Sequence, residues 1–182
     1  MAAPSPAPLR ASTPDVFRNG RFEPNDFAIL ETDGGGDGLI LPLAALRATL
    51  EDNGDGNGPG NRRLGLLYAP ADRFEDVAPL ISRLAVIAVD FPKYADGRGF
   101  SHAARLVRAG FSGEIRAVGD VLIDEIALMR RVGFTAFEVS HPTTRRYLAE
   151  GRDPSPDLHY QPGAVPEPPA GTRPWLRRRA TE

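Results

Sequence analysis

Apolar residues follow two different spacings along residues 64–139 of the chain. Four short apolar runs have the length and composition of buried strands, at 64–68, 84–90, 115–118 and 135–139. The segments between them repeat apolar residues every three or four positions, which predicts amphipathic helices near 72–84, 101–109 and 120–132. Strands joined by single helices require crossover connections, so the pattern predicts an α/β fold of consecutive β-α units around a parallel sheet. Both an open sheet and a partial barrel satisfy this pattern.

The segment before residue 64 predicts a smaller β element and one more strand-helix unit. Asn19-Gly20 separates two short apolar-bearing arms, which indicates an N-terminal β-hairpin with a type I′ turn. Residues 38–42 form an apolar run, and the leucines that follow it recur at helical spacing. Pro79 falls inside the helix expected at 72–84, so that helix must kink or begin later.

Composition divides the chain into a central domain and two flanking segments. Residues 1–14 are rich in proline and lack a secretory signal pattern, which predicts a disordered lead-in. Residues 15–150 are expected to form a single α/β domain, with a mobile glycine-rich loop at 51–63. Residues 151–182 are expected to be a proline-rich tail, because prolines interrupt both helices and central strands. Trp175 and the arginines after it also fit a docking peptide.

The bulk composition excludes several classes of function. The chain has no cysteine, which excludes disulfides, thiolate metal sites and a cysteine nucleophile. Its formal net charge of -2 gives no general attraction to nucleic acid or to an anionic membrane surface. No apolar run approaches the roughly 20 residues of a membrane helix. We therefore expect a soluble, cytoplasmic protein with neither nucleic acid nor membrane as its partner.

The loop after the second of the four strands is the richest in candidate chemistry. Ligands bind at the carboxyl ends of parallel strands, and this loop follows the strand that ends at Asp90. Its glycines, positive charges and helix start predict a site for a small anion, formed by Lys93, Asp96, Gly97, Arg98, Gly99 and Ser101. The alternative is that the glycines only make a turn, Ser101 only caps a helix and the charges are solvated. The loop lacks the residues of a Walker motif and the third glycine of a dinucleotide fingerprint.

Three carboxylates offer a second constellation. Asp90, Asp120 and Glu138 lie at or near the ends of successive predicted strands, where they could converge on a divalent metal. Acids at strand ends also cap helices, and Asp120 has that alternative available. The three histidines share no ligand-like spacing, so no metal or catalytic role is assigned to them.

The residues also support a family resemblance. The block from Phe91 to Val139 contains DGRGFS, EIRAVGDVL and GFTAFE, and it resembles the bacterial domain of unknown function 934 family. With the preceding strand-helix units, the resemblance covers about residues 15–145. Members of that family are typically encoded beside the assimilatory sulfite reductase, so the resemblance implies a role in sulfite reduction during cysteine synthesis. No nicotinamide, flavin or haem motif is recognisable, so any redox chemistry would reside in a partner.

Two positions depart from the family pattern, and they narrow the candidate site. Glu125 stands where a glutamine is common, and Val132 stands where a cysteine is often found. If the family shares a site, the DGRG loop, Arg116, Asp120 and Glu138 are therefore better candidates.

Three hypotheses follow for the function. The leading one is an accessory protein of sulfite reduction, in which Lys93, Arg98 and Arg116 contact a small oxyanion or an acidic surface of sulfite reductase. The second is a metal-assisted lyase or isomerase that uses the three carboxylates. The third is an adaptor that works through its arginine-ended tail.

Overall fold

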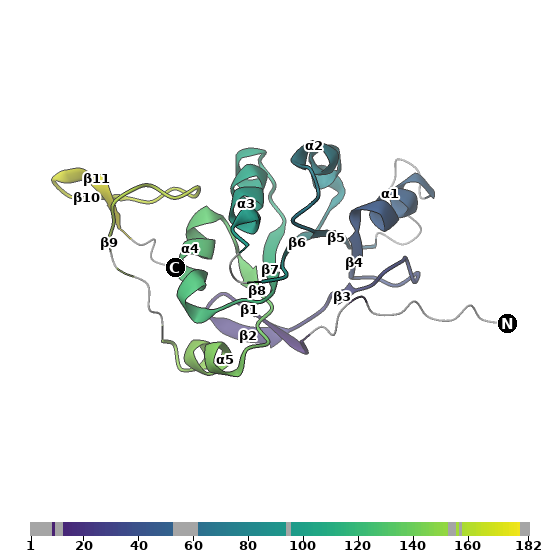
Figure 1. Ribbon diagram of the computed structural model, residues 1–182, viewed down its shortest axis with the longest axis horizontal. Helices are drawn as coiled ribbons and strands as arrows, with labels where there is room; N and C mark the ends of the chain where they lie inside the picture. Colours follow the sequence, from purple (N-terminus) through teal and green to yellow (C-terminus); the bar gives the residue numbers. More distant parts are fainter. Residues whose placement is uncertain are drawn as a thin grey trace.

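A curled sheet of eight strands forms the centre of the computed structural model (Figure 1), which describes residues 9, 13–52, 62–93, 96–152, 156 and 158–178. Six parallel strands lie in chain order: β3 (Ala28–Ile29), β4 (Leu39–Pro42), β5 (Leu64–Tyr68), β6 (Val86–Phe91), β7 (Glu114–Gly119) and β8 (Ala136–Phe137). The predicted α/β fold with a parallel sheet is confirmed, and the sheet is a half-barrel rather than a flat, open sheet.

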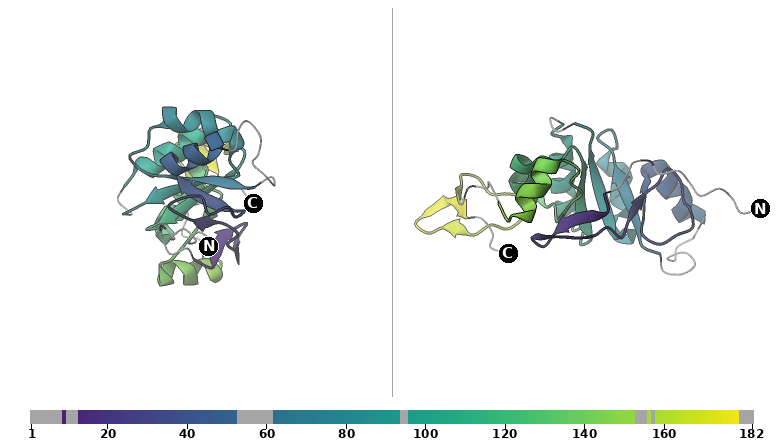
Figure 2. Two further views of the ribbon diagram at one scale, coloured as in Figure 1. Left: turned by 90° about the vertical axis from the view of Figure 1, so that its right-hand side faces the viewer. Right: turned by 90° about the horizontal axis from the view of Figure 1, so that it is seen from below.

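Helices follow most of these strands and cover the outer face of the sheet (Figures 1 and 2). They are α1 (Leu43–Asp52), α2 (Phe74–Val77) continued by the 3-10 helix η1 (Ala78–Arg83), α3 (Arg98–Arg108), α4 (Ile123–Val132) and α5 (Pro142–Ala149), which lies below β1 and β2 in Figure 1. Pro79 explains the 3-10 segment, because it is the second residue after the helix α2 and has no amide hydrogen to donate to the next α-helical hydrogen bond. The predicted single helix over 72–84 is therefore split.

An antiparallel hairpin extends the sheet beyond β8. Strands β1 (Asp15–Arg18) and β2 (Arg21–Pro24) pair with each other, and β1 also pairs with β8. Asn19 and Gly20 have φ values of 51° and 74°, as a type I′ turn requires, so the predicted hairpin is confirmed. The rings of Phe17 and Phe22 meet edge to face with centroids 5.2 Å apart, which fixes the register of the hairpin.

Alternate residues of the strands face two separate apolar layers. Ile87 and Val89 point to the outer layer, where they pack with side chains of the helices such as Leu106. Val86 and Ala88 of the same strand point to the inner face of the half-barrel, which Phe27 helps to cover. The period of two along a strand thus decides which residues can reach the inner face.

Several elements differ from the sequence prediction. Helix α3 begins at Arg98, three residues before the predicted start at Ser101, and α5 and the short β3 carry no strong sequence signal. Most of the predicted lead-in and of the glycine-rich loop lies outside the described residues. No helix in the described part of the chain has the length and apolarity to cross a membrane.

Residues 158–178 contain strands that the prolines of this segment did not suggest. β9 (Leu158–His159), β10 (Pro169–Ala170) and β11 (Arg173–Arg178) form an antiparallel sheet with β11 in the middle. We call residues 158–178 the arm, because they extend beyond α4 at one end of the molecule in both Figure 1 and the right view of Figure 2. The prolines are compatible with this sheet because Pro169 lies in the edge strand β10, and Pro174 lies outside the residues of β11 that pair with β9.

The last turn of α4 holds the base of the arm. Arg131 Nε donates to Glu167 Oε1 at 2.6 Å, and the Gly163 amide donates to Glu167 Oε2 at 2.8 Å. The Arg131 carbonyl accepts hydrogen bonds from the amides of Ala164 and Val165 at 2.8 and 3.2 Å. The Glu167 side chain is almost fully buried, so this clamp is a strong charge-assisted contact.

Protonation of Glu167 should loosen the arm. Burial alone would raise the pKa of Glu167. The hydrogen bonds from Arg131 and the Gly163 amide outweigh this effect, so the pKa lies below the usual value of 4.5. The clamp is therefore complete above pH 4.5 and is lost as the pH falls through the pKa of the folded protein. Trp175, the only tryptophan, lies on the arm, so its fluorescence anisotropy reports the mobility of the arm.

For wild-type protein we expect the anisotropy to stay constant from neutral pH to pH 4.5 and then to fall. Glu167→Gln should give the lower value already at neutral pH, whereas Glu150→Gln, which alters an exposed pair with Arg152, should behave as wild type. Equal anisotropy in Glu167→Gln and wild-type protein at neutral pH would contradict the clamp.

Gly99 and Gly97 make a matched pair for testing how α3 packs on the sheet. A Cβ at Gly99 would lie 2.5 Å from the ring of Phe91, whereas a Cβ at Gly97 would meet nothing within 4 Å. We expect Gly99→Ala to destabilise the fold by about 1–3 kcal/mol, because the ring and helix must move apart. Gly97→Ala should change stability by less than about 0.5 kcal/mol. Urea unfolding measures both, and similar midpoints for the two variants would refute this packing role.

Candidate functional site

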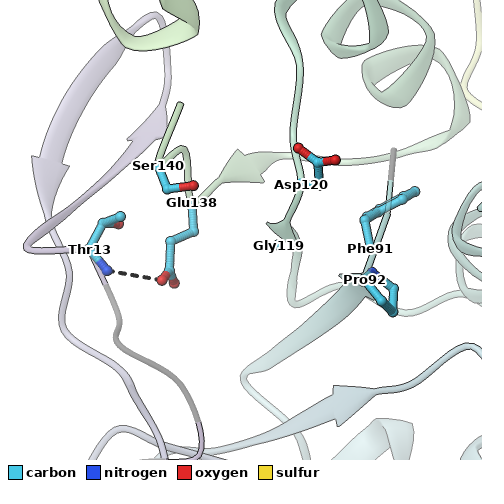
Figure 3. A pocket seen from close by; sticks show the side chains of 7 residues that line it. All are labelled: Thr13, Phe91, Pro92, Gly119, Asp120, Glu138 and Ser140. Carbon is cyan, nitrogen blue, oxygen red and sulfur yellow. Dashed lines mark hydrogen bonds between the residues drawn. The ribbon is translucent and has the colours of Figure 1, made fainter. Parts of the chain in front are cut away.

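A pocket of about 360 Å³ opens at the carboxyl ends of β6, β7 and β8 (Figure 3). It is lined by Thr13, Phe91, Pro92, Gly119, Asp120, Glu138 and Ser140. Ligands bind at this edge in half-barrels and open parallel sheets alike. Two of the residues selected from the sequence, Asp120 and Glu138, thus line one cavity at the edge where functional groups were expected.

Gly119 determines how closely β6 and β7 approach at this edge. Phe91 and Gly119 are paired in the parallel register, and the Asp120 amide donates to the Phe91 carbonyl at 2.8 Å. A Cβ at Gly119 would lie 2.3 Å from that carbonyl oxygen, and the φ of 99° also disfavours any other residue. The Val-Gly-Asp sequence therefore turns the chain sharply after β7 and directs Asp120 to the rim of the pocket.

Glu138 and Thr13 close the opposite side of the pocket. Glu138 is 4% exposed, and its Oε1 accepts a hydrogen bond from the Thr13 amide at 3.0 Å. The Thr13 hydroxyl donates in turn to the Asp15 carbonyl at 2.6 Å, which fixes the chain just before β1. The sequence offered no signal for Thr13, because it belongs to the stretch that was expected to be disordered.

The three predicted metal ligands do not form one metal centre. Asp90 and Glu138 both face the inside of the half-barrel, and Asp120 lies at its rim. Glu138 is directed to the Thr13 amide, while Asp90 Oδ1 lies beside Gly119. Among the described residues, no group of three or more acidic, histidine or cysteine side chains has an arrangement that could hold a metal ion. A shared position at the strand ends was thus insufficient to bring the three carboxylates together as one set of metal ligands.

The predicted anion loop is organised around an internal ion pair. Arg98 donates to both carboxylate oxygens of Asp96, from Nε at 2.9 Å and from Nη2 at 2.6 Å. Because of these hydrogen bonds, Arg98 lowers the pKa of Asp96 to about 2. The carboxylate therefore stays ionised at neutral pH and offsets the charge that an anion would need. Arg98 also reaches the Pro70 carbonyl at 3.4 Å, away from the residues that line the pocket.

The other residues of that loop have separate positions. Gly99 packs against Phe91, and Gly97 is exposed at the start of α3. Ser101 lies inside α3 rather than at its N-terminus, so the predicted capping role is wrong. Lys93 is exposed and is followed by residues 94–95, which lie outside the described part. The use of this loop as an anion site remains a prediction.

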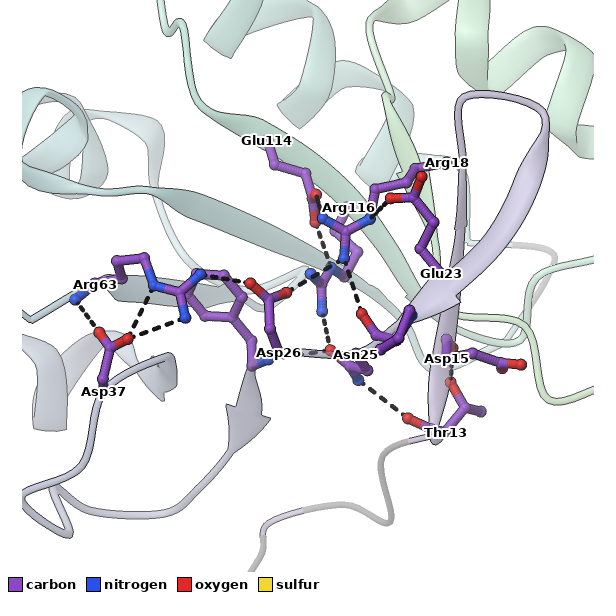
Figure 4. Close-up of polar contacts among 12 residues, drawn as sticks. Thr13, Asp15, Arg18, Glu23, Asn25, Asp26, Asp37, Arg63, Glu114 and Arg116 are labelled. Carbon is purple, nitrogen blue, oxygen red and sulfur yellow. Dashed lines mark hydrogen bonds and ion pairs between the residues drawn. The ribbon is translucent and has the colours of Figure 1, made fainter.

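Arg116 lies in a different place again, on the inner face of the half-barrel (Figure 4). Its side chain is fully buried, and it donates to Glu114 at 2.6 Å and to Asn25 Oδ1 at 2.8 Å. Its guanidinium also lies 5.4 Å from the ring centroid of Phe27. Arg116 thus holds the segment after β2 over the sheet, and it cannot touch a partner surface together with Lys93 and Arg98.

The neighbouring charges continue this network along the same segment (Figure 4). Arg18 pairs with Glu114 at 3.1 Å and with Asp26 at 3.3 Å, and Asp26 also pairs with Arg63. Burial opposes ionisation of Asp26, but hydrogen bonds from Arg63 and Arg18 outweigh it and lower the pKa of Asp26. Alternation along β7 with the outward-facing Ile115 and Ala117 places Arg116 on the inner face, whereas no pattern in the sequence identifies its partners.

Tyr68 and His102 form a further buried pair beside the start of α3. Their rings stack with centroids 4.0 Å apart, and burial raises the pKa of Tyr68 to about 12. Burial also lowers the pKa of His102, so both rings are neutral at neutral pH. This pair packs α3 against β5.

The comparisons with known proteins agree with the resemblance seen in the sequence. No curated protein and no solved structure shows significant similarity to the chain. A family model described as "Bacterial protein of unknown function (DUF934)" matches residues 65–170, more than half of the 182 residues. The match begins later than the predicted start at residue 15 and continues past residue 145, into the arm. The chain therefore belongs to the DUF934 family of bacterial proteins.

Proposed function

We propose that this protein is an accessory protein of assimilatory sulfite reduction in cysteine synthesis, and that it acts with sulfite reductase. The resemblance of the Phe91–Val139 block supports this role, since it implies that the gene lies beside that of the reductase. The chemistry of electron transfer would then belong to the reductase, and this chain would assist it by binding.

The position of the family-like segments in the structure supports a site for this role. Three parts of the block that carries the resemblance meet at the same pocket: Phe91-Pro92, Gly119-Asp120 and Glu138. These parts are separated by 18 or more residues in the sequence and lie on three different strands or strand ends. The residues that carry the family resemblance therefore converge at this pocket, and we assign the accessory role to it.

The chemistry of the pocket favours a partner group over free sulfite. Asp120 and Glu138 are hydrogen-bond acceptors when ionised, and Ser140 adds a hydroxyl. A small oxyanion would meet repulsion from the two carboxylates, whereas a lysine, arginine or amide group would find acceptors. We propose that Asp120, which is partly exposed at the rim, accepts hydrogen bonds from such a group of the reductase.

Growth on different sulfur sources tests this role. A strain that lacks the protein should grow poorly with sulfate or sulfite as its only sulfur source and normally with sulfide or cysteine. Wild-type protein should restore growth, and Asp120→Asn should not, because the amide cannot supply two anionic acceptor oxygens. Asp124→Asn is the matched control, since Asp124 is exposed in the first turn of α4 and outside the pocket.

Two outcomes would contradict different parts of the proposal. Equal growth of the deletion and parent strains on sulfate, with normal amounts of reductase, would refute the role in sulfite reduction. Full restoration by Asp120→Asn would leave that role in place and refute the assignment to the pocket.

A further inference from the structure

The arm has the surface of a docking element. Trp175 is 56% exposed in the central strand β11, and Tyr160 is 72% exposed just after β9. Large exposed aromatic side chains are uncommon on a surface that faces only water, and tryptophan, tyrosine and arginine are the residues enriched among strong contacts of interfaces. These two side chains therefore suggest a surface that a partner covers.

The charge of the arm points to the chemistry of that partner. Residues 168–178 contain Arg173, Arg177 and Arg178 and no acidic residue. Within the described part of the chain, no carboxylate forms an ion pair with these three arginines. Arg173, Trp175 and Arg177 occupy alternate positions of β11, so they share one face of the small sheet. A ligand with acidic groups on both sides of an apolar group complements this order.

The clamp at the base of the arm makes this surface pre-organised. Arg131 binds Glu167 through its side chain and holds Ala164 and Val165 through its carbonyl. The arm is thus held against α4 before any partner arrives, which lowers the entropy lost on binding. Leu128, one turn before Arg131 on α4, is 48% exposed and adds an apolar side chain near the base.

We propose that the arm docks an acidic segment of a partner protein, with Trp175 as the apolar anchor and with Arg173 and Arg177, on the same face of β11, as the ionic contacts. A protein segment fits better than a nucleic acid, because the basic residues are confined to one short strand and the whole chain has a net charge of -2. This inference goes beyond the proposed function, since it concerns a different surface and holds for any partner with such a segment.

A defined probe tests the arm in the full-length protein. The probe is a fluorescein-labelled peptide in which glutamate and phenylalanine alternate, and binding is measured by its fluorescence anisotropy. We expect it to bind wild-type protein, to shift the emission of Trp175 and to bind less tightly as salt is added. A peptide with lysine in place of glutamate should not bind.

Substitutions locate the binding to the arm. The double variant Arg173→Glu and Arg177→Glu should weaken binding of the acidic peptide by at least about tenfold, and Trp175→Ala should weaken it as well. The double variant Arg105→Glu and Arg108→Glu changes the net charge equally on the exposed side of α3 and should bind as wild type. Unfolding midpoints should stay near that of wild type. The side-chain hydrogen bonds of Arg177 stay within β11, and Arg105 adds only its contact with the ring of Phe74.

Three results would overturn the proposal. They are absence of binding by wild-type protein, equal weakening by the two double variants, and tighter binding of a single-stranded DNA oligonucleotide than of the acidic peptide. The last result would assign the arm to a nucleic acid instead.

Discussion

The close approach of β6 and β7 at the Phe91-Gly119 pair is the constraint on which the site depends. Only a residue without a Cβ lets the Phe91 carbonyl accept the hydrogen bond of the Asp120 amide, because a Cβ would lie 2.3 Å from that oxygen. This pair ends both strands at the same level and turns Asp120 toward the pocket rim. Gly99 of α3 packs against the ring of the same phenylalanine. Phe91 therefore ends β6, lines the pocket and contacts α3.

Charged side chains fix the parts of the structure that lie outside the β-α units. Arg116 holds the segment after β2 over the inner face of the half-barrel, and the pair of Arg145 and Asp15, at 2.7 Å, ties α5 to β1. The Arg131 and Glu167 pair does the same for the arm. Each pair joins segments that are far apart in the sequence, so these contacts are long-range constraints that short apolar patterns cannot specify. They explain how a half-barrel with few strands keeps its N-terminal and C-terminal segments in place.

The fold could be predicted from the sequence largely because its signals are local. The apolar runs at 64–68 and 115–118 lie within observed strands, and Asn19-Gly20 determines its turn through backbone conformation alone. The sequence did not reveal the side-chain partners, since these depend on register and curvature. Asp96 pairs with Arg98 at the start of α3, and Arg116 is buried on the inner face. Glu138 accepts a hydrogen bond from the Thr13 amide in the pocket. Candidate site residues of the sequence thus have three different environments. Prolines also misled the prediction for residues 158–178, because a small sheet tolerates them in an edge strand and at strand positions that have a neighbour on one side only.

The pocket lies at the carboxyl ends of β6, β7 and β8, and the arm lies beyond α4, so the protein has two separate surfaces for the contacts that we propose. The most direct measurement of the central claim is sulfite reductase activity per amount of reductase in extracts of the parent, deletion and complemented strains. If the protein assists the reductase as we propose, specific activity is lower without the protein, recovers with wild-type protein and does not recover with Asp120→Asn. Equal specific activity in the parent and deletion extracts would contradict it.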